Sequence, residues 1–123
     1  MQLYVGNAAE DGTSTRGWFI GRFIIPAIGG IRSTSEFESK WCVCRAGQMR
    51  SAPARPAAGT TVVILVAGQL RLIFDDREVV LSRPADYAMW NGEGSHSWIA
   101  ETESTVITFR TPSGREGDSA ALG

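Results

Sequence analysis

The feature that most constrains this sequence is its division into short runs of β-branched and aromatic residues, each ended by Gly, Pro or Asp. Such runs predict an all-β sandwich or barrel rather than alternating strands and helices. No segment longer than about ten residues places its apolar residues at helical spacing. We expect strands at residues 18–25, 36–44, 60–67, 69–74, 78–81, 86–90, 96–100 and 105–110.

Three segments predict particular features: a hairpin turn, a lid and a strand that is apolar on both faces. Asp75 and Asp76 separate two expected strands and predict a hairpin turn, because Asp tolerates turn conformations. Residues 48–59 are rich in Ala, Pro and Arg and are long enough to cover a barrel mouth as a lid. Residues 61–67 (TVVILVA) are apolar on both faces. They predict either a central strand covered on both sides or a strand that meets a second subunit in a homodimer.

The length of 123 residues fits a single domain. We divide it into an arm or edge strand at 1–16, a barrel at 17–112 and a flexible tail at 113–123. The net charge of −1 provides no basic field for a nucleic acid or an anionic membrane, and the longest apolar run is too short to cross a bilayer. The start of the chain lacks the pattern of a secretion signal, so we expect a cytoplasmic protein with two free thiols, Cys42 and Cys44.

Two segments carry a resemblance to a known family. The first is ESKWCVCRAG at residues 38–47, and the second is RPADYAMW at residues 83–90, which runs on to HSW at 96–98. They resemble the small single-domain bacterial cupins, which read close to KWGxHxxG and PGDYxxWxPGxPHSW at these places. The resemblance spans roughly residues 17–113. It implies a single-domain cupin-type jelly-roll barrel, also called a double-stranded β-helix, and leaves the activity open because this barrel hosts many activities.

The resemblance also bears on metal binding. Cupins place the two histidines of an HxH motif, a carboxylate and a later histidine around one metal ion. In this sequence Cys42 and Cys44 stand at the HxH positions, and His96, the only histidine, stands at the later one. Ser95 replaces the family proline and Ala85 the family glycine. We therefore expect no metal cofactor. The alternative is a zinc or copper site formed by Cys42, Cys44 and His96, because thiolate and imidazole are ligands for both metals.

Strand alternation places Glu38, Lys40, Cys42 and Cys44 on one face. That face is either the solvated side of an edge strand or the barrel wall, and the resemblance favours the wall. Inward-facing Glu38 and Lys40 must pair with each other or with other polar groups, since an isolated buried charge is strongly unfavourable. Such groups are suited to proton transfer, and His96 is either a third group of this kind or a structural histidine.

The remaining candidate ligand-binding residues lie on expected strands, and most of them are aromatic or basic. Aromatic walls and a few polar groups are typical of a small-molecule pocket, although tryptophans also serve as core residues and arginines as surface charges. The predicted catalytic residues are Glu38, Lys40 and His96, and the predicted ligand-binding residues are Trp18, Arg22, Cys42, Cys44, Trp98, Thr108 and Arg110.

These residues predict an enzyme that uses the barrel interior as a largely apolar pocket for a small molecule. We favour a metal-independent cyclase or isomerase, such as a ring-closing or cycloaddition step of polyketide-type biosynthesis. A pocket promotes ring closure by holding the reactive conformer and offering one or two hydrogen bonds. One alternative is a metal-dependent cupin epimerase, lyase or dioxygenase with Cys and His ligands, and the other is a non-catalytic binding protein.

Overall fold

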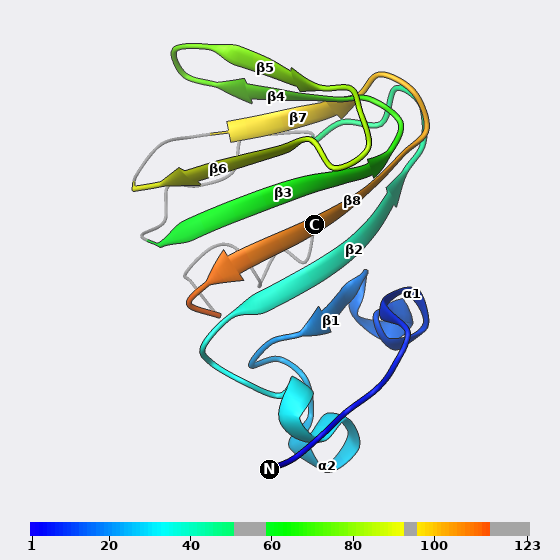
Figure 1. The fold of residues 1–123 in the computed structure, drawn as a ribbon, viewed down its shortest axis with the longest axis vertical. Coiled ribbons are helices and arrows are strands. Elements are labelled where there is room, and N and C mark those ends of the chain that lie inside the picture. The colour runs from blue at the N-terminus through cyan, green and yellow to red at the C-terminus, as the bar shows by residue number, and fades with distance from the viewer. Residues whose placement is uncertain (51–58, 93–95, 114–123) are drawn as a thin grey trace.

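The computed structural model describes residues 1–50, 59–92 and 96–113. It contains two antiparallel sheets (Figure 1), one of five strands in the order β1-β2-β8-β3-β6 and one of three in the order β5-β4-β7. The strands are β1 (Trp18–Ile20), β2 (Glu38–Cys44), β3 (Thr60–Ala67), β4 (Leu70–Phe74), β5 (Glu78–Leu81), β6 (Tyr87–Asn91), β7 (His96–Ala100) and β8 (Ser104–Thr111). The all-β architecture predicted from the sequence is confirmed.

Three of the expected strands, β3, β5 and β7, have the predicted bounds, and most of the others differ by one or two residues. The exception is the strand expected at 18–25, which ends at Ile20. There the Gly21 N–H donates to the Arg32 carbonyl at 2.9 Å, and the Ile24 N–H donates to the Gly21 carbonyl at 3.2 Å. These bonds turn the chain out of the sheet, so alternation does not continue beyond β1.

The first 16 residues form an arm that contains helix α1 (Ala8–Asp11) and the 3-10 helix η1 (Thr13–Thr15), and none of these residues is in a strand. The Asn7 side chain caps α1 by accepting a hydrogen bond from the Glu10 N–H at 3.1 Å. Helix α2 (Pro26–Gly29) and the 3-10 helix η2 (Gly30–Arg32) follow β1 and lie beside the N-terminus in Figure 1. Each α-helix has only four residues, too few to show a period in the sequence.

The hydrophobic core lies between the two sheets. Its buried members are Cys44, Val63, Leu65, Leu70, Leu72, Leu81, Ala100 and Val106. On β3 the inward side chains Thr61, Val63 and Leu65 are buried, and each apolar one contributes about 1.5–3 kcal/mol by leaving water. Strand β3 lies between β8 and β6 in the five-stranded sheet, and on its outer face Val66 is 38% exposed.

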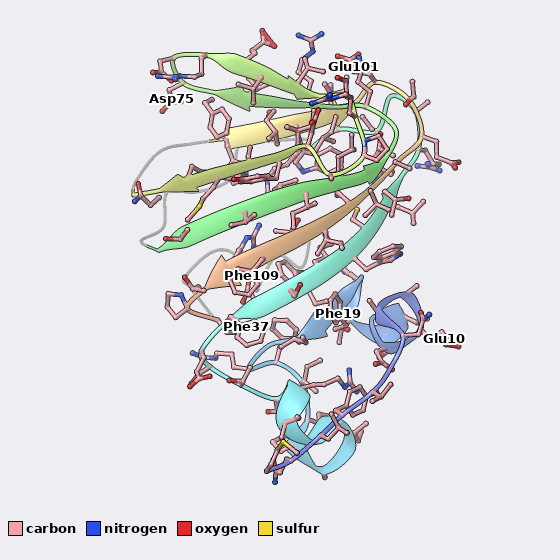
Figure 2. All side chains as sticks on the ribbon, in the orientation of Figure 1. Glu10, Phe19, Phe37, Asp75, Glu101 and Phe109 are labelled. Atoms are coloured by element: carbon pink, nitrogen blue, oxygen red, sulfur yellow. The ribbon has the colours of Figure 1, made fainter. Side chains whose placement is uncertain are left out.

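Two turns connect the sheets and their strands. At Gly68 the chain leaves β3 with a φ of +98°, and a Cβ there would lie 2.3 Å from the Glu103 carbonyl oxygen, so only glycine fits. The predicted hairpin turn is confirmed, because the Phe74 N–H donates to the Arg77 carbonyl at 2.8 Å across Asp75 and Asp76. Figure 2 shows Asp75 at the tip of the β4–β5 hairpin. Among the described residues, no helix has the length and apolar character needed to span a membrane.

Candidate functional site

A cavity of about 50 Å³ opens between the two sheets. That volume accommodates a few water molecules, each of which needs about 10–15 Å³. Its polar and thiol-bearing wall consists of Lys40, Cys42, Cys44, Arg50, Thr61, His96, Thr108 and Arg110. Its apolar wall consists of Val63, Leu70, Leu72, Trp90, Trp98 and Val106. The cavity is therefore lined by both sheets and combines basic, thiol, hydroxyl and aromatic groups.

Strand register brings the polar wall together. In the β2–β8 pair, Lys40 lies opposite Thr108 and Cys42 lies opposite Val106. Thr108 in turn lies opposite Val63 on β3. Because opposite residues on paired strands point to the same side of the sheet, these rows all face the cavity. The inward orientation predicted for Lys40, Cys42 and Cys44 is the one found, since all three line the cavity.

Glu38 occupies a fully buried position behind this wall. The Arg110 guanidinium donates from Nη1 to Glu38 Oε2 at 3.4 Å, and the Ser113 hydroxyl donates to Glu38 Oε1 at 3.1 Å. Glu38 has no exposed surface and is not among the residues that line the cavity. It therefore supports Arg110 from behind the cavity wall, and the catalytic role predicted for it stays a prediction.

Trp18 also supports the cavity from behind. The Arg110 Cζ lies 5.0 Å from the centroid of the Trp18 ring, and the Lys40 Nζ lies 5.6 Å from it. Cations at these distances are attracted to the ring face. Trp18 is 1% exposed and does not line the cavity. It therefore holds the two cationic side chains, whereas the sequence predicted a direct contact with a ligand.

The thiols of Cys42 and Cys44 lie 3.1 Å apart. The hydrogen bond from Cys44 lowers the pKa of Cys42 to about 6; burial acts against this shift and the charge of Lys40 adds to it. The same hydrogen bond, together with burial, raises the pKa of Cys44. Near neutral pH the pair therefore shares one proton, which Cys44 donates to the Cys42 thiolate.

Lys40 is the only lysine in the chain. Burial lowers its pKa, and the neighbouring positive charges of Arg110 and Arg50 lower it further. The charges of Cys42 and Cys44 act in the opposite direction. A lysine whose pKa is lowered is neutral more often near physiological pH and is a better proton acceptor.

Arg50 is a cavity residue that the sequence analysis missed. Its N–H donates to the Trp98 carbonyl at 3.1 Å, and the Ala100 N–H donates to the Gln48 carbonyl at 2.9 Å. Residues 48–50 therefore run along β7 and bring Arg50 to the cavity. No local pattern signals this pairing, which depends on the neighbouring strand. Residues 51–58 of the predicted lid and 114–123 of the predicted tail lie outside the described residues.

The three-stranded sheet contributes His96 and Trp98, both of which line the cavity as predicted. The His96 ring lies 5.0 Å from the Trp90 ring and 6.4 Å from the Phe74 ring, measured between centroids. Within residues 1–50, 59–92 and 96–113, no three His, Cys, Asp or Glu side chains form a group that could hold a metal ion. The set of Cys42, Cys44 and His96 considered above is therefore not gathered into a metal centre.

Arg22 is the predicted ligand-binding residue that the structure places elsewhere. It is exposed and does not line the cavity. The prediction assumed that β1 continues to residue 25, but the turn at Gly21 ends the strand, and the Arg22 N–H donates to the Ser113 hydroxyl at 2.9 Å. The predicted contribution of Thr108 and Arg110 from β8 matches the structure, since both line the cavity.

No family model matches this sequence, and the curated proteins include no similar sequence. Solved structures do resemble the fold. A cupin superfamily protein from Desulfitobacterium hafniense has a TM-score of 0.58 and 15% identity, covering 64% of this chain and 70% of its own. A sugar phosphate isomerase of the cupin superfamily from Silicibacter pomeroyi has a TM-score of 0.57 and 20% identity, and the match covers 72% of this chain and 57% of the isomerase chain.

A third structure, a point mutant of salicylate 1,2-dioxygenase from Pseudoaminobacter salicylatoxidans, has a TM-score of 0.59 and 21% identity, covering 77% of this chain and 26% of its own. Taken with the two antiparallel sheets, these likenesses define a small β-barrel. The chain has the cupin fold and is a small cupin-like domain.

Proposed function

We propose that the barrel interior binds a small metabolite that carries a carboxylate and that Lys40 transfers a proton within it, as in an isomerase or a cyclase. The observation that carries this proposal is that Lys40 and Arg110 line one cavity and both lie against the Trp18 ring. Arg50 adds a third basic side chain to the lining. Glu38 pairs with Arg110 from behind the wall, and the guanidinium groups of Arg110 and Arg50 are the charged donors that an anion would meet in the lining.

Arg110 is suited to anchoring the carboxylate. A guanidinium offers paired N–H donors that match the two oxygens of a carboxylate. The buried Arg110 Nε has no hydrogen-bond partner among the described residues. An unpaired buried donor costs about 1–3 kcal/mol, so a ligand oxygen that accepts from this N–H removes the penalty.

Lys40 is suited to moving the proton. With its pKa lowered by burial, the neutral amine accepts a proton from the carbon beside a carbonyl group of the ligand. The resulting enolate is stabilised by the positive charges of Arg110 and Arg50. The Lys40 ammonium then returns the proton to a different atom, so the reaction is an isomerisation with no net gain or loss of protons.

The volume of the cavity bears on substrate size. At about 50 Å³ it is much smaller than pockets for drug-sized ligands, which occupy about 300–1,000 Å³. It favours a short-chain acid over the long flexible chain of a polyketide-type intermediate. A ring-closing reaction on such a chain would require a wider cavity. One of the structural relatives is a sugar phosphate isomerase, and the same reaction class is proposed here for the same fold.

Deuterium exchange tests the proposal. Wild-type protein is incubated in D₂O with a panel of short-chain α-keto and α-hydroxy acids, and the loss of C–H signals is followed by proton NMR. We expect exchange in at least one acid. Lys40→Met should abolish exchange even at acid concentrations high enough to offset its weaker binding, where the acid still raises the thermal unfolding temperature. Arg83→Met, at a side chain 86% exposed, is the matched control and should exchange like the wild type. Binding without exchange would overturn the enzymatic role in favour of a binding protein. If no acid binds, both the enzymatic role and the proposed binding of a carboxylate are overturned.

A further inference from the structure

The cavity contains one chemical group that the proposed proton transfer does not use, the pair of thiols on β2. Cys42 and Cys44 lie two residues apart on one face of the strand, with their sulfur atoms 3.1 Å apart. Both line the cavity, Cys44 at 1% exposure and Cys42 half-buried. Two sulfur atoms at this distance inside a cavity support chemistry that a single buried cysteine does not.

We propose that Cys42 and Cys44 form an oxidisable dithiol, which hydrogen peroxide or another small hydroperoxide converts reversibly into an intramolecular disulfide inside the cavity. A cavity with room for a few water molecules also admits hydrogen peroxide, which is of similar size. The inference stands on the positions of the two sulfur atoms and does not require the proposed function.

Hydrogen peroxide is the oxidant in this reaction. The Cys42 thiolate attacks one peroxide oxygen, the O–O bond breaks, and Cys42 becomes a sulfenic acid while hydroxide leaves and takes up a proton from solvent. The Cys44 sulfur then attacks the Cys42 sulfur, the S–O bond breaks, and the departing hydroxide combines with the Cys44 proton as water. In total the two sulfur atoms lose two electrons, and one hydrogen peroxide is reduced to two water molecules.

The two cysteines have different environments, which assigns the order of the steps. Cys42 is the more accessible of the two, and Lys40 stabilises its thiolate, whose pKa is lowered to about 6 by the hydrogen bond from Cys44. Cys44 is buried and retains its proton, since its pKa is raised. Because the thiolate is the nucleophile, Cys42 is the attacking cysteine and Cys44 is the resolving one.

Strand geometry brings the two cysteines within reach of a disulfide. A strand rises about 3.3 Å per residue, which places the two Cα atoms about 6.6 Å apart, near the upper end of the range of about 4.4–6.8 Å found in disulfides. The sulfur atoms need to approach by only about 1 Å to reach the bond length of about 2.05 Å. The paired strands β1 and β8 on either side of β2 oppose further adjustment.

Mass spectrometry of the full chain tests the inference. Reduced protein is treated with equimolar hydrogen peroxide, alkylated, and compared as intact protein and as peptides. We expect the wild type to lose two hydrogen atoms per chain, with both thiols disappearing together, and dithiothreitol to restore them. In Cys44→Ser the attacking thiol has no resolving partner, so Cys42 should gain one oxygen and form an adduct with dimedone. In Cys42→Ser the remaining thiol should react at least about tenfold more slowly, because it is buried and protonated.

Two controls keep the result interpretable. Thermal unfolding under reducing conditions shows whether each serine variant is folded, and wild-type protein in urea gives the reactivity of the same thiols without the cavity. The inference is overturned if the folded wild type gains oxygen without bridging or forms disulfides between chains. It is also overturned if the folded wild type bridges no faster than the chain in urea. None of these outcomes depends on a substrate, so the proposed function is tested separately.

Discussion

Arg110 and Glu38 form an ion pair inside the barrel, with Arg110 Nη1 3.4 Å from Glu38 Oε2 and side-chain exposures of only 8% and 0%. Ser113 donates a further hydrogen bond to the same carboxylate, and Trp18 lies against the guanidinium. These contacts fix one of the cationic groups of the cavity from behind. A buried pair of this kind adds little net stability by itself, but it leaves a costly unpaired charge when one partner is lost.

Glu38→Gln should destabilise the fold strongly. The glutamine keeps the shape of the side chain but leaves the buried Arg110 charge without its counter-charge, and the expected loss is about 3–5 kcal/mol in the free energy of unfolding. Urea unfolding measures it, with Glu36→Gln as an exposed control expected to change little. The double variant Glu38→Leu with Arg110→Met should lose less than the sum of the single variants, because both charges are removed together. Additive losses would show that the pair is not coupled.

Lys40 should titrate below the ordinary range of a lysine. Because it is the only lysine, a single ¹³Cε signal in protein labelled with ¹³C-lysine reports it without assignment. Burial lowers its pKa, so the midpoint should lie below the value of about 10.4 for an exposed lysine, which the same protein in urea should show. Removing the thiolate by Cys42→Ser should lower the midpoint further, since Cys42 raises the pKa of Lys40. A midpoint in the folded protein at or above that in urea would contradict the burial of Lys40.

The lowered pKa of Lys40 also makes the stability of the fold depend on pH. Between the lowered pKa in the folded protein and the ordinary pKa in the unfolded chain, the unfolded chain binds more protons. The stability of the wild type relative to Lys40→Met should therefore rise as pH increases through that window. Urea unfolding of both proteins at several pH values measures this difference, and a difference that falls with pH would contradict it.

Cys42 should be reactive at unusually low pH. Its alkylation by iodoacetamide should increase through about pH 6 and level off above it, because the thiolate predominates once pH exceeds the pKa. Cys44→Ala removes the hydrogen bond that is the largest cause of the shift, so the midpoint should move up toward about 8.5. Rates of alkylation at Cys42, measured by peptide mass spectrometry from acid to alkaline pH, test both statements. An unchanged midpoint in Cys44→Ala would refute the thiol–thiol hydrogen bond.

The homodimer expected from the sequence remains a prediction, and the outer face of the five-stranded sheet is where it can be tested. Exposed apolar side chains gather there, including Val43 at 57%, Tyr87 at 65% and Met89 at 64%. Phe37 and Phe109, labelled in Figure 2, stack with their ring centroids 5.1 Å apart. Met89→Glu should weaken self-association more than about tenfold, because it would bury an unpaired charge in the interface. Light scattering over a concentration series measures it, with Val80→Glu on β5 as the control. A monomeric wild type at high concentration would rule this dimer out.

The features that the sequence predicted correctly are those fixed by local alternation. The bounds of β3, β5 and β7 follow from the local pattern of residue types, and the shared face of Lys40, Cys42 and Cys44 follows from the period of two along a strand. The inward direction of that face was favoured by the family resemblance and not by alternation. The turn at Asp75 and Asp76 is likewise a local property of two adjacent residues.

The features that it did not predict depend on which strands meet. Glu38 and Arg110 are 72 positions apart and become partners only through the β2–β8 register. Arg50 reaches the cavity because its segment pairs with β7. Arg22 was placed in the site by extending alternation past Gly21, where hydrogen bonds to Arg32 and Ile24 end the strand. Register and strand ends are set by tertiary contacts, which a single sequence does not display.

The central claim is that Lys40 and Arg110 make the barrel interior a site for a small carboxylate, and an NMR titration tests it most directly. Wild-type protein labelled with ¹⁵N is titrated with a panel of short-chain mono- and dicarboxylates, and the indole N–H signals of Trp90 and Trp98 are followed with the backbone amides of β2 and β8. We expect saturable shifts confined to these cavity residues for at least one acid, with affinity reduced more than about tenfold in Lys40→Met. Shifts that are absent, that spread over the outer face, or that persist unchanged in Lys40→Met would contradict the claim.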